Sequence, residues 1–266
     1  MNIWTKKSIE LANQKDYLDQ LFKVYPIADN LKREVNNNLK TKIKDLYDHQ
    51  DKFNLLNILL NQKKFPVKDS YVPYLKKDRE ALKRNPNTVD RLCGKLFEMG
   101  FDSLIDGMTV PKEANRQMGP LFNNWLLSGS IGAHITDNEM KFLNSSQNMI
   151  FSGKDAKMKE IAIKHLGYTR KNKGLDLLAK FNNNYVIGEA KFLTDFGGHQ
   201  NDQIEDAFAT LRSKLNPTGK KVHIIAILDG VLYIPSKNKM HRYLENAENN
   251  EIILSSLFLR DYLYSI

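Results

Sequence analysis

The sequence predicts an α+β protein made of a helical N-terminal region and a mixed α/β core. In the first hundred residues, apolar side chains recur at helical spacing, for instance Leu55, Ile58 and Leu59. From residue 153 to residue 234, short apolar runs separated by Asn, Gly and Asp indicate strands and helices in the order helix, strand or loop, strand, strand, helix, strand. We therefore expect residues 1–127 to form the helical region and residues 128–266 to form the core, packed as one continuous unit.

Composition limits the class of protein. The chain has 266 residues, which is enough for a proper hydrophobic core, and no apolar run approaches the ~20 residues of a membrane span. Cys93 is the single cysteine, and the start of the chain does not resemble a signal peptide, so we expect a cytoplasmic protein. The net charge of +9 favours a polyanionic partner, although a lysine-rich composition also has this effect without any such partner.

Several short helices are expected between residue 1 and about residue 100. Leu18, Leu21, Phe22 and Tyr25 form one apolar stripe, and a longer stripe begins at Val89 and continues to Phe97. Prolines divide the region into short segments. These stripes indicate core packing.

The segment 111–120 is rich in side chains that recognise DNA bases. Arg pairs with guanine, and Asn or Gln pairs with adenine, through two hydrogen bonds each. The cluster of Lys112, Asn115, Arg116 and Gln117 therefore predicts a DNA contact, with the polar face of an ordinary helix as the alternative. Gly119-Pro120 is expected to break or kink that helix, and Phe122, Trp125 and Leu126 are expected to be core anchors beyond the break.

Residues 128–153 are expected to form a connector or DNA-contacting loop around a short helix at residues 139–143. Ser152 then resembles the N-cap of a helix that ends at Gly167. The pattern from Tyr168 to Asn172 fits a strand or a loop.

Two strands with a tight turn are expected between Leu175 and Phe192. Side chains alternate between the two faces of a strand, and one register matches the apolar sides of both strands. A two-residue turn at Asn183-Asn184 gives that register, and a four-residue loop would give the same parity. The opposite face then carries Asp176, Glu189 and Lys191 together.

These three side chains predict a phosphodiester-cleaving site. Two carboxylates close together favour a hard divalent cation such as Mg²⁺, which relieves their repulsion. An ammonium beside them orients a water molecule, or helps to deprotonate it if its pKa is lowered.

The chain beyond Lys191 is expected to contact DNA and then to complete the sheet. Two glycines permit close backbone approach to a phosphate, and the polar residues after them are suited to reading bases, so the predicted contacts are Gly197, Gly198, His199, Gln200 and Asn201. A helix capped by Asn201 comes next, and then a buried strand at 222–228 that turns at Asp229-Gly230 into a strand at 231–234. A short strand at 251–254 and a helix at 257–264 close the chain.

Asp176, a spacer and then Glu189-Ala190-Lys191 resemble the catalytic pattern of the PD-(D/E)xK nuclease superfamily, and the chain is most similar to its type II restriction endonucleases. Leu175 stands where the superfamily pattern has proline. The resemblance implies a restriction-endonuclease-like αβββαβ core with a mixed central sheet, and an N-terminal region for DNA recognition or dimerisation. It also implies a homodimer that hydrolyses double-stranded DNA with Mg²⁺ at a short specific sequence, leaving 5′-phosphate ends, alongside a cognate DNA methyltransferase in the same cell.

Within this resemblance, Asp176, Glu189 and the Ala190 carbonyl are the expected metal ligands. Some superfamily members add an acid from the helix before the catalytic strands, which here would be Glu160. Glu113 is a further candidate for an additional acid. Two alternatives remain: a repair or junction-resolving nuclease that uses the same three residues, and a DNA-binding protein without catalysis.

Overall fold

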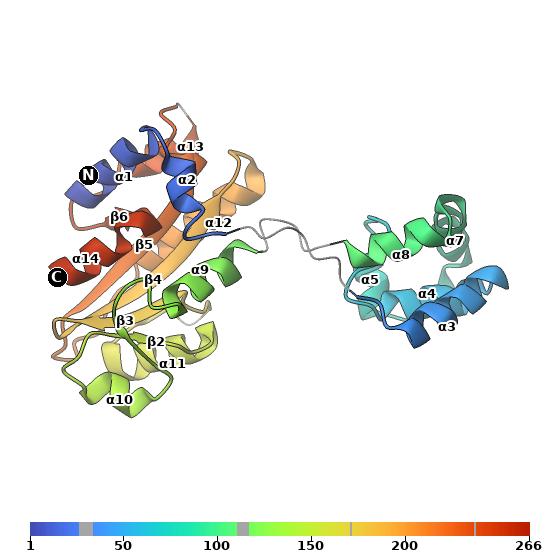
Figure 1. The fold of residues 1–266 in the computed structure, drawn as a ribbon, viewed down its shortest axis with the longest axis horizontal. Coiled ribbons are helices and arrows are strands. Elements are labelled where there is room, and N and C mark those ends of the chain that lie inside the picture. Colours follow the sequence, from blue (N-terminus) through green and yellow to red (C-terminus); the bar gives the residue numbers. More distant parts are fainter. Residues whose placement is uncertain (27–33, 111–116, 171, 237) are drawn as a thin grey trace. The chain divides into compact units, whose positions relative to one another are not determined.

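The computed structural model describes every residue except 27–33, 111–116, 171 and 237 (Figure 1). It divides into two compact units, which we call the sheet unit (Met1–Ile27 with Glu113–Ile266) and the helical unit (Ala28–Lys112). The division expected at residue 127 grouped the helices α1 (Ile3–Ala12), α2 (Tyr17–Leu21) and α9 (Met118–Leu127) with the N-terminal region. Their apolar side chains pack in the core of the sheet unit instead.

The sheet unit is built on one six-stranded mixed sheet, as the fold class predicted. The strands lie in chain order, and β2, β3 and β4 form antiparallel neighbours while the other pairs are parallel. Their bounds are β1 (His134–Thr136), β2 (Met149–Phe151), β3 (Leu177–Phe181), β4 (Asn184–Leu193), β5 (Val222–Gly230) and β6 (Ile252–Leu254).

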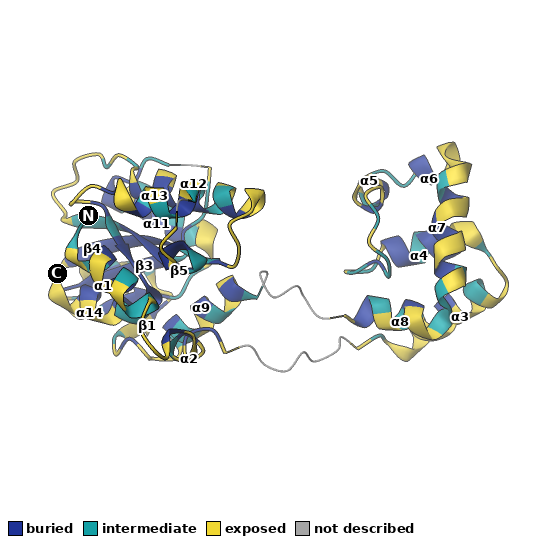
Figure 2. Ribbon diagram, turned by 90° about the horizontal axis from the view of Figure 1, so that it is seen from above, coloured by how far each residue is buried: buried dark blue, intermediate teal, exposed yellow. Residues whose placement is uncertain are grey.

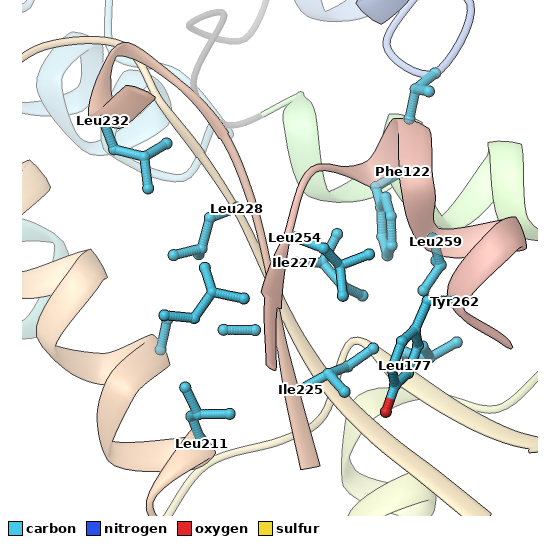
Figure 3. Close-up of a cluster of buried hydrophobic side chains, with 14 of the residues drawn as sticks. Phe122, Leu177, Leu211, Ile225, Ile227, Leu228, Leu232, Leu254, Leu259 and Tyr262 are labelled. Carbon is cyan, nitrogen blue, oxygen red and sulfur yellow. The ribbon is translucent and has the colours of Figure 1, made fainter. Parts of the chain in front are cut away.

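Helices cover both faces of this sheet (Figure 2). On one face lie α11 (Asp155–Leu166), α12 (Gly198–Leu211) and α13 (Lys239–Glu245); on the other lie α1, α2, α9 and α14 (Leu259–Ser265). Figure 3 shows the alternation along β5: Leu228 lies on the side of Leu211, whereas Ile225 and Ile227 lie on the side of Phe122 and Tyr262. Side-chain alternation thus supplies apolar contacts to both layers.

The hairpin between β3 and β4 has the predicted parity but a different turn. Phe181 pairs with Asn184, so the two turn residues are Asn182 and Asn183, with φ of 48° and 64°. Positive φ at both positions is the requirement of the tight hairpin turn that matches strand twist, and asparagine tolerates it. The turn comes one residue earlier than predicted. The predicted turn would have made Lys191 the cross-strand neighbour of Asp176, whereas the observed turn makes it Glu189.

Residues 128–153 are more ordered than predicted. They contain β1, β2 and the short helix α10 (Glu139–Asn144), of which only the helix was predicted. In residues 168–172, apart from the undescribed residue 171, the structure has no named strand, and Tyr168 forms a single bridge to Leu215. The strand that pairs with β3 on the side away from β4 is therefore β2, which precedes α11 in the chain rather than following it.

Helix starts account for three further corrections. Helix α9 begins at Met118, so Pro120 lies in its first turn, where the missing N–H costs no intrahelical bond. The N-cap of α11 is Lys154 rather than Ser152, and Gly197 rather than Asn201 precedes α12. As predicted, Gly167 ends α11 in the left-handed conformation.

At the C-terminal end, β5 continues through Gly230 and the chain then forms a short 3-10 helix, Val231–Tyr233, where a strand was predicted. Gly230 has a φ of 100°, and a Cβ there would lie 2.0 Å from the Leu193 carbonyl oxygen. Only glycine fits this change of direction. Helix α13 was not predicted, while β6 and α14 agree with the predicted closing strand and helix.

The N-terminal segment is joined to the sheet by buried hydrogen bonds. The Tyr25 hydroxyl donates to Asp229 Oδ2 over 2.8 Å, and the Thr5 hydroxyl donates to the Ile253 carbonyl over 2.9 Å. Asp229 is fully buried, and burial raises its pKa above the usual value although hydrogen bonds from Ser255, Ser256 and Tyr25 lower it. This segment is an integral part of the sheet unit.

The helical unit has a separate apolar core. Its helices are α3 (Asn37–Asp48), α4 (Lys52–Leu60), α5 (Val72–Lys77), α6 (Ala81–Arg84), α7 (Pro86–Met99) and α8 (Phe101–Thr109). The predicted stripe of α7 is buried at Val89, Leu92, Cys93 and Leu96. None of the helices in the described parts of the chain combines the length and the apolar character that a membrane span requires.

Tyr25→Phe should lower the free energy of unfolding by about 1.5–3 kcal/mol, because it removes a buried hydrogen bond to a carboxyl group. Urea denaturation measures the change. Tyr243→Phe, which removes the hydroxyl of a half-buried tyrosine outside this cluster, is the control. Equal stability of the two variants would contradict the role of the Tyr25 bond.

Cys93 should not react with a thiol reagent at pH 8 while the helical unit is folded. Burial raises the pKa of its thiol to about 12, so almost no thiolate is present, and the side chain is inaccessible. Absorbance after addition of Ellman's reagent measures the reaction. The protein in concentrated urea should react fully, and rapid reaction without urea would show that this core does not form.

Candidate active site

The end of the β3–β4 hairpin brings the predicted acidic residues together. The last ladder pair is Leu177 with Gly188, and one residue further the Asp176 N–H donates to the Gly188 carbonyl over 3.1 Å. The carboxylate of Asp176 accepts a hydrogen bond from the Ala190 N–H at 2.9 Å. Asp176 is therefore held against β4 beside Glu189, as the parity of the hairpin predicted.

Two glycines allow the backbone to pass close to its neighbours here. A Cβ at Gly188 would lie 3.0 Å from Leu177 Cβ and 3.2 Å from Ile227 Cδ1, on the face opposite the carboxylates. A Cβ at Gly174 would lie 2.4 Å from Asp155 Cβ, at the start of α11. Larger side chains at these positions would displace the segment that carries Asp176.

The ammonium of Lys191 contacts all of the predicted metal ligands. Its Nζ lies 2.5 Å from Glu189 Oε1, 3.4 Å from Asp176 Oδ2 and 2.9 Å from the Ala190 carbonyl oxygen. Burial lowers the pKa of Lys191. The charges of Asp176 and Glu189, together with hydrogen bonds to both, raise the pKa by more than burial lowers it, so it lies above the usual value. Lys191 is thus an ammonium at neutral pH, and its pKa is not lowered as a general base requires.

Glu189 is the most deeply buried member of the group. Its side chain is 1% exposed, compared with 35% for Asp176 and 17% for Lys191. Oε2 of Glu189 is buried and has no hydrogen-bond partner among the described residues. A buried carboxylate oxygen without a donor is costly, which is consistent with a site for a further cation.

A second ammonium, from Lys173, was not predicted. Its Nζ lies 3.0 Å from Glu189 Oε1 and 2.6 Å from Asp206 Oδ2 on α12. Lys173 precedes β3 in irregular backbone, so strand alternation gives no signal for its direction. Asp206 is 30 residues away from Asp176 in the sequence, and only the packing of α12 on the sheet brings it to Lys173.

A cavity of about 550 Å³ adjoins Asp176. Its wall combines the start of α9, the loop before α11 and the first turn of α11, including Asn123, Ser152, Lys154 and Asp155. The volume is in the usual range of binding pockets. Of Asp176, Glu189 and Lys191, Asp176 is thus the residue that lines a cavity large enough for a ligand.

Glu160, one of the two additional acids proposed from the sequence, points away from this group. Glu160 has a side chain that is 62% exposed and pairs with Lys157 at 3.4 Å. This agrees with its position opposite the buried stripe of α11. Glu113 lies outside the described residues. The acid that adjoins the cavity together with Asp176 is Asp155, which was not predicted.

The predicted DNA-contacting residues fall into two groups. Lys112, Asn115 and Arg116 lie outside the described residues, and Gln117 directly precedes α9. After Lys191, Gly197 precedes α12, and Gly198 and the three residues after it form its first turn.

Two members of that first turn differ in their surroundings. His199 has a side chain that is 90% exposed. Gln200 is buried and accepts a hydrogen bond from the Thr194 N–H at 3.3 Å, so its amide points back at the loop.

The site's fit to a divalent cation rests on oxygen donors from two carboxylates and one backbone carbonyl. Oxygen ligands suit Mg²⁺, which keeps several waters and needs few protein ligands. The unpartnered Oε2 of Glu189 supports this fit. Among the described residues, no cluster of three or more His, Cys, Asp or Glu side chains is arranged to hold a metal ion.

The mixed sheet covered by helices, with acids and an ammonium at the end of a central hairpin, is a restriction-endonuclease-like α+β fold. A comparison with protein families matches residues 2–266 to the Tsp45I type II restriction enzyme family. The chain belongs to this family, which is a family of site-specific endonucleases. Comparisons with curated proteins and with solved structures gave no match.

Proposed function

We propose that this restriction enzyme hydrolyses DNA at the Asp176–Glu189–Lys191 group, in the manner of the PD-(D/E)xK nucleases. The observation that carries the proposal is the position of the Lys191 ammonium, within 3.4 Å of oxygen atoms from both carboxylates. In this proposal Asp176, Glu189 and the Ala190 carbonyl hold Mg²⁺. The bound ion supplies charge neutralisation at the phosphate and activation of a water molecule.

The roles of the protein groups follow from their burial and charge. Glu189 is fixed inside the sheet, so it provides a rigid ligand, whereas the half-buried Asp176 lies at the cavity and faces the substrate. Lys191 contacts the three proposed ligand atoms, so its ammonium lies next to the position that the attacking water and the phosphate would take. As a cation, Lys191 then orients the attacking water and stabilises the charge that develops on the phosphoryl oxygens. Attack in line with the 3′ leaving oxygen yields 5′-phosphate and 3′-hydroxyl ends.

DNA recognition is proposed to use segments on either side of this site. Gly197, Gly198 and His199 come soon after β4, at the N-terminal end of α12, and a helix N-terminus is suited to a phosphate. The N–H groups of Gln200 and Asn201 donate to the Gly197 carbonyl instead. Lys112, Asn115, Arg116 and Gln117 precede α9, whose start lines the cavity. We propose that these groups contact the duplex. We also propose that residues 1–127 serve DNA recognition and dimerisation.

A homodimer with two-fold symmetry would place one active site on each strand of a palindromic or near-palindromic sequence. Such an enzyme would act in the cytoplasm, beside a methyltransferase that protects the same sequence in the host DNA. The junction-resolving alternative uses the same three residues, but family membership favours recognition of a sequence in linear duplex.

Asp176→Asn and Lys191→Ala should each lower the cleavage rate by about 10²- to 10⁴-fold, because each removes a group that acts on the reacting phosphate. Single-turnover cleavage of plasmid DNA measures the rate, and gel-shift assays in Ca²⁺ should show that DNA binding persists. The matched controls are Asp261→Asn and Lys164→Ala, at exposed positions on α14 and α11. Unchanged cleavage by either active-site variant would refute its assigned role.

Digestion of a sequenced plasmid should require Mg²⁺ and give discrete fragments, whereas EDTA should abolish cleavage. The fragments should be joined by DNA ligase without prior phosphorylation, and phosphatase treatment should prevent the joining. Fragments that need a kinase before ligation would argue against 5′-phosphate ends. A smear in place of bands, or cleavage restricted to branched DNA, would argue against the proposed sequence specificity.

A further inference from the structure

The second ammonium at Glu189 has no role in the mechanism above. Lys173 Nζ contacts the same carboxylate oxygen, Oε1, as Lys191 does, and it makes a shorter contact with Asp206 on α12. Its side chain is 30% exposed, so it lies between the buried carboxylate and the surface. Lys173 is therefore shared by two acids of unequal burial.

Glu189 depends on these cations in the absence of metal. Its carboxylate is almost completely buried, and burying an ionised carboxylate carries a large desolvation penalty unless opposite charges compensate it. Two ammonium groups on one oxygen provide that compensation. A bound divalent cation would supply the same compensation with a larger charge, and it would repel an ammonium that remained on Oε1.

Asp206 is a ready alternative partner for Lys173. Arg170 donates from Nη1 to the Asp206 backbone carbonyl at 2.9 Å and to the Thr210 hydroxyl at 2.6 Å, and its Nη2 lies 3.2 Å from Asp206 Oδ1. These bonds hold the Asp206 carboxylate next to Lys173, so its ammonium would remain paired if it left Glu189.

We propose that Lys173 is an internal counter-cation of Glu189, which sets the affinity of the site for Mg²⁺ by competing with the metal for this carboxylate. When the metal binds, Lys173 moves to full pairing with Asp206. Lys173 is thus a positioning residue that acts through Glu189. The inference rests on the proposed role of Glu189 as a metal ligand.

Two substitutions should change metal affinity in opposite directions. Lys173→Met keeps much of the length of the side chain and removes its charge, so Mg²⁺ should bind on the order of tenfold more tightly. Asp206→Asn removes the alternative partner of Lys173, so Mg²⁺ should bind more weakly. In the double variant the effect of Asp206→Asn should largely vanish, because the two residues act through one contact.

The measurement is the Mg²⁺ dependence of the thermal unfolding midpoint, together with isothermal titration with Mg²⁺, both without DNA. Metal-free Lys173→Met should unfold at a lower temperature than wild type, and Mg²⁺ should raise its unfolding midpoint by more than it raises that of wild type. Lys173→Arg, which keeps the charge, should bind Mg²⁺ nearly as wild type does. Lys164→Met, an exposed lysine on α11, is the matched control for loss of charge.

Glu189→Gln separates the failure of this inference from failure of the proposed function. If Glu189→Gln leaves Mg²⁺ binding unchanged, the carboxylate is not a ligand and both proposals are wrong. If Glu189→Gln abolishes Mg²⁺ binding while Lys173→Met binds as wild type or more weakly, the metal site stands and the counter-cation role is overturned. If Lys173→Met does not fold, Asp206→Asn provides the test. Weaker Mg²⁺ binding by Asp206→Asn, and equally weak binding when Asp206→Asn is combined with Lys173→Arg, would support the role. Unchanged Mg²⁺ binding by Asp206→Asn would overturn it.

Discussion

The compensation of one buried negative charge, on Glu189, governs the arrangement of the candidate active site. Carboxylates are rarely placed in the interior of a sheet, because the loss of hydration is repaid only by close opposite charges. Here one ammonium comes from the same strand, two residues further on, and another comes from the irregular segment before β3. Two ammonium groups of the chain thus already compensate this carboxylate.

The position of this charge follows from the central place of β4 in the sheet. It pairs with β3 on one side and with β5 on the other, and its nine-residue pairing with β5 makes it the best-supported strand of the sheet. The residues from Val186 to Phe192 that face α9 are small or apolar, and Gly188 allows close packing there. The candidate site residues Glu189 and Lys191 lie on the other face, towards α11 and α12. Alternate residues of one strand therefore serve packing and the proposed chemistry.

The chain path around this sheet explains the two compact units. The N-terminal helices pack on the sheet and are held by Tyr25 and Thr5 before the chain enters the helical unit, and it returns to the sheet through α9. The start of α9 then lines the cavity beside Asp176. The polar residues that were predicted to read DNA, up to Gln117, thus come directly before a helix that borders the candidate active site.

Local pattern was enough to predict the class of fold and the grouping of the three candidate residues, because both depend on short-range rules. Alternation along two strands and the parity of their turn place Asp176, Glu189 and Lys191 on one face whichever of the two asparagine pairs forms the turn. The helix end at Gly167 and the buried strand at 222–228 follow from similar local preferences.

The short strands β1 and β2 and the 3-10 helix after β5 were not predictable in this way, because each is only three residues long and depends on a distant partner. For the same reason only the tertiary structure reveals that Lys173 and Asp206 join the site and that the N-terminal helices belong to the sheet unit. Those contacts link residues far apart in the chain, and their energy comes from burial and paired charge that a linear pattern does not contain.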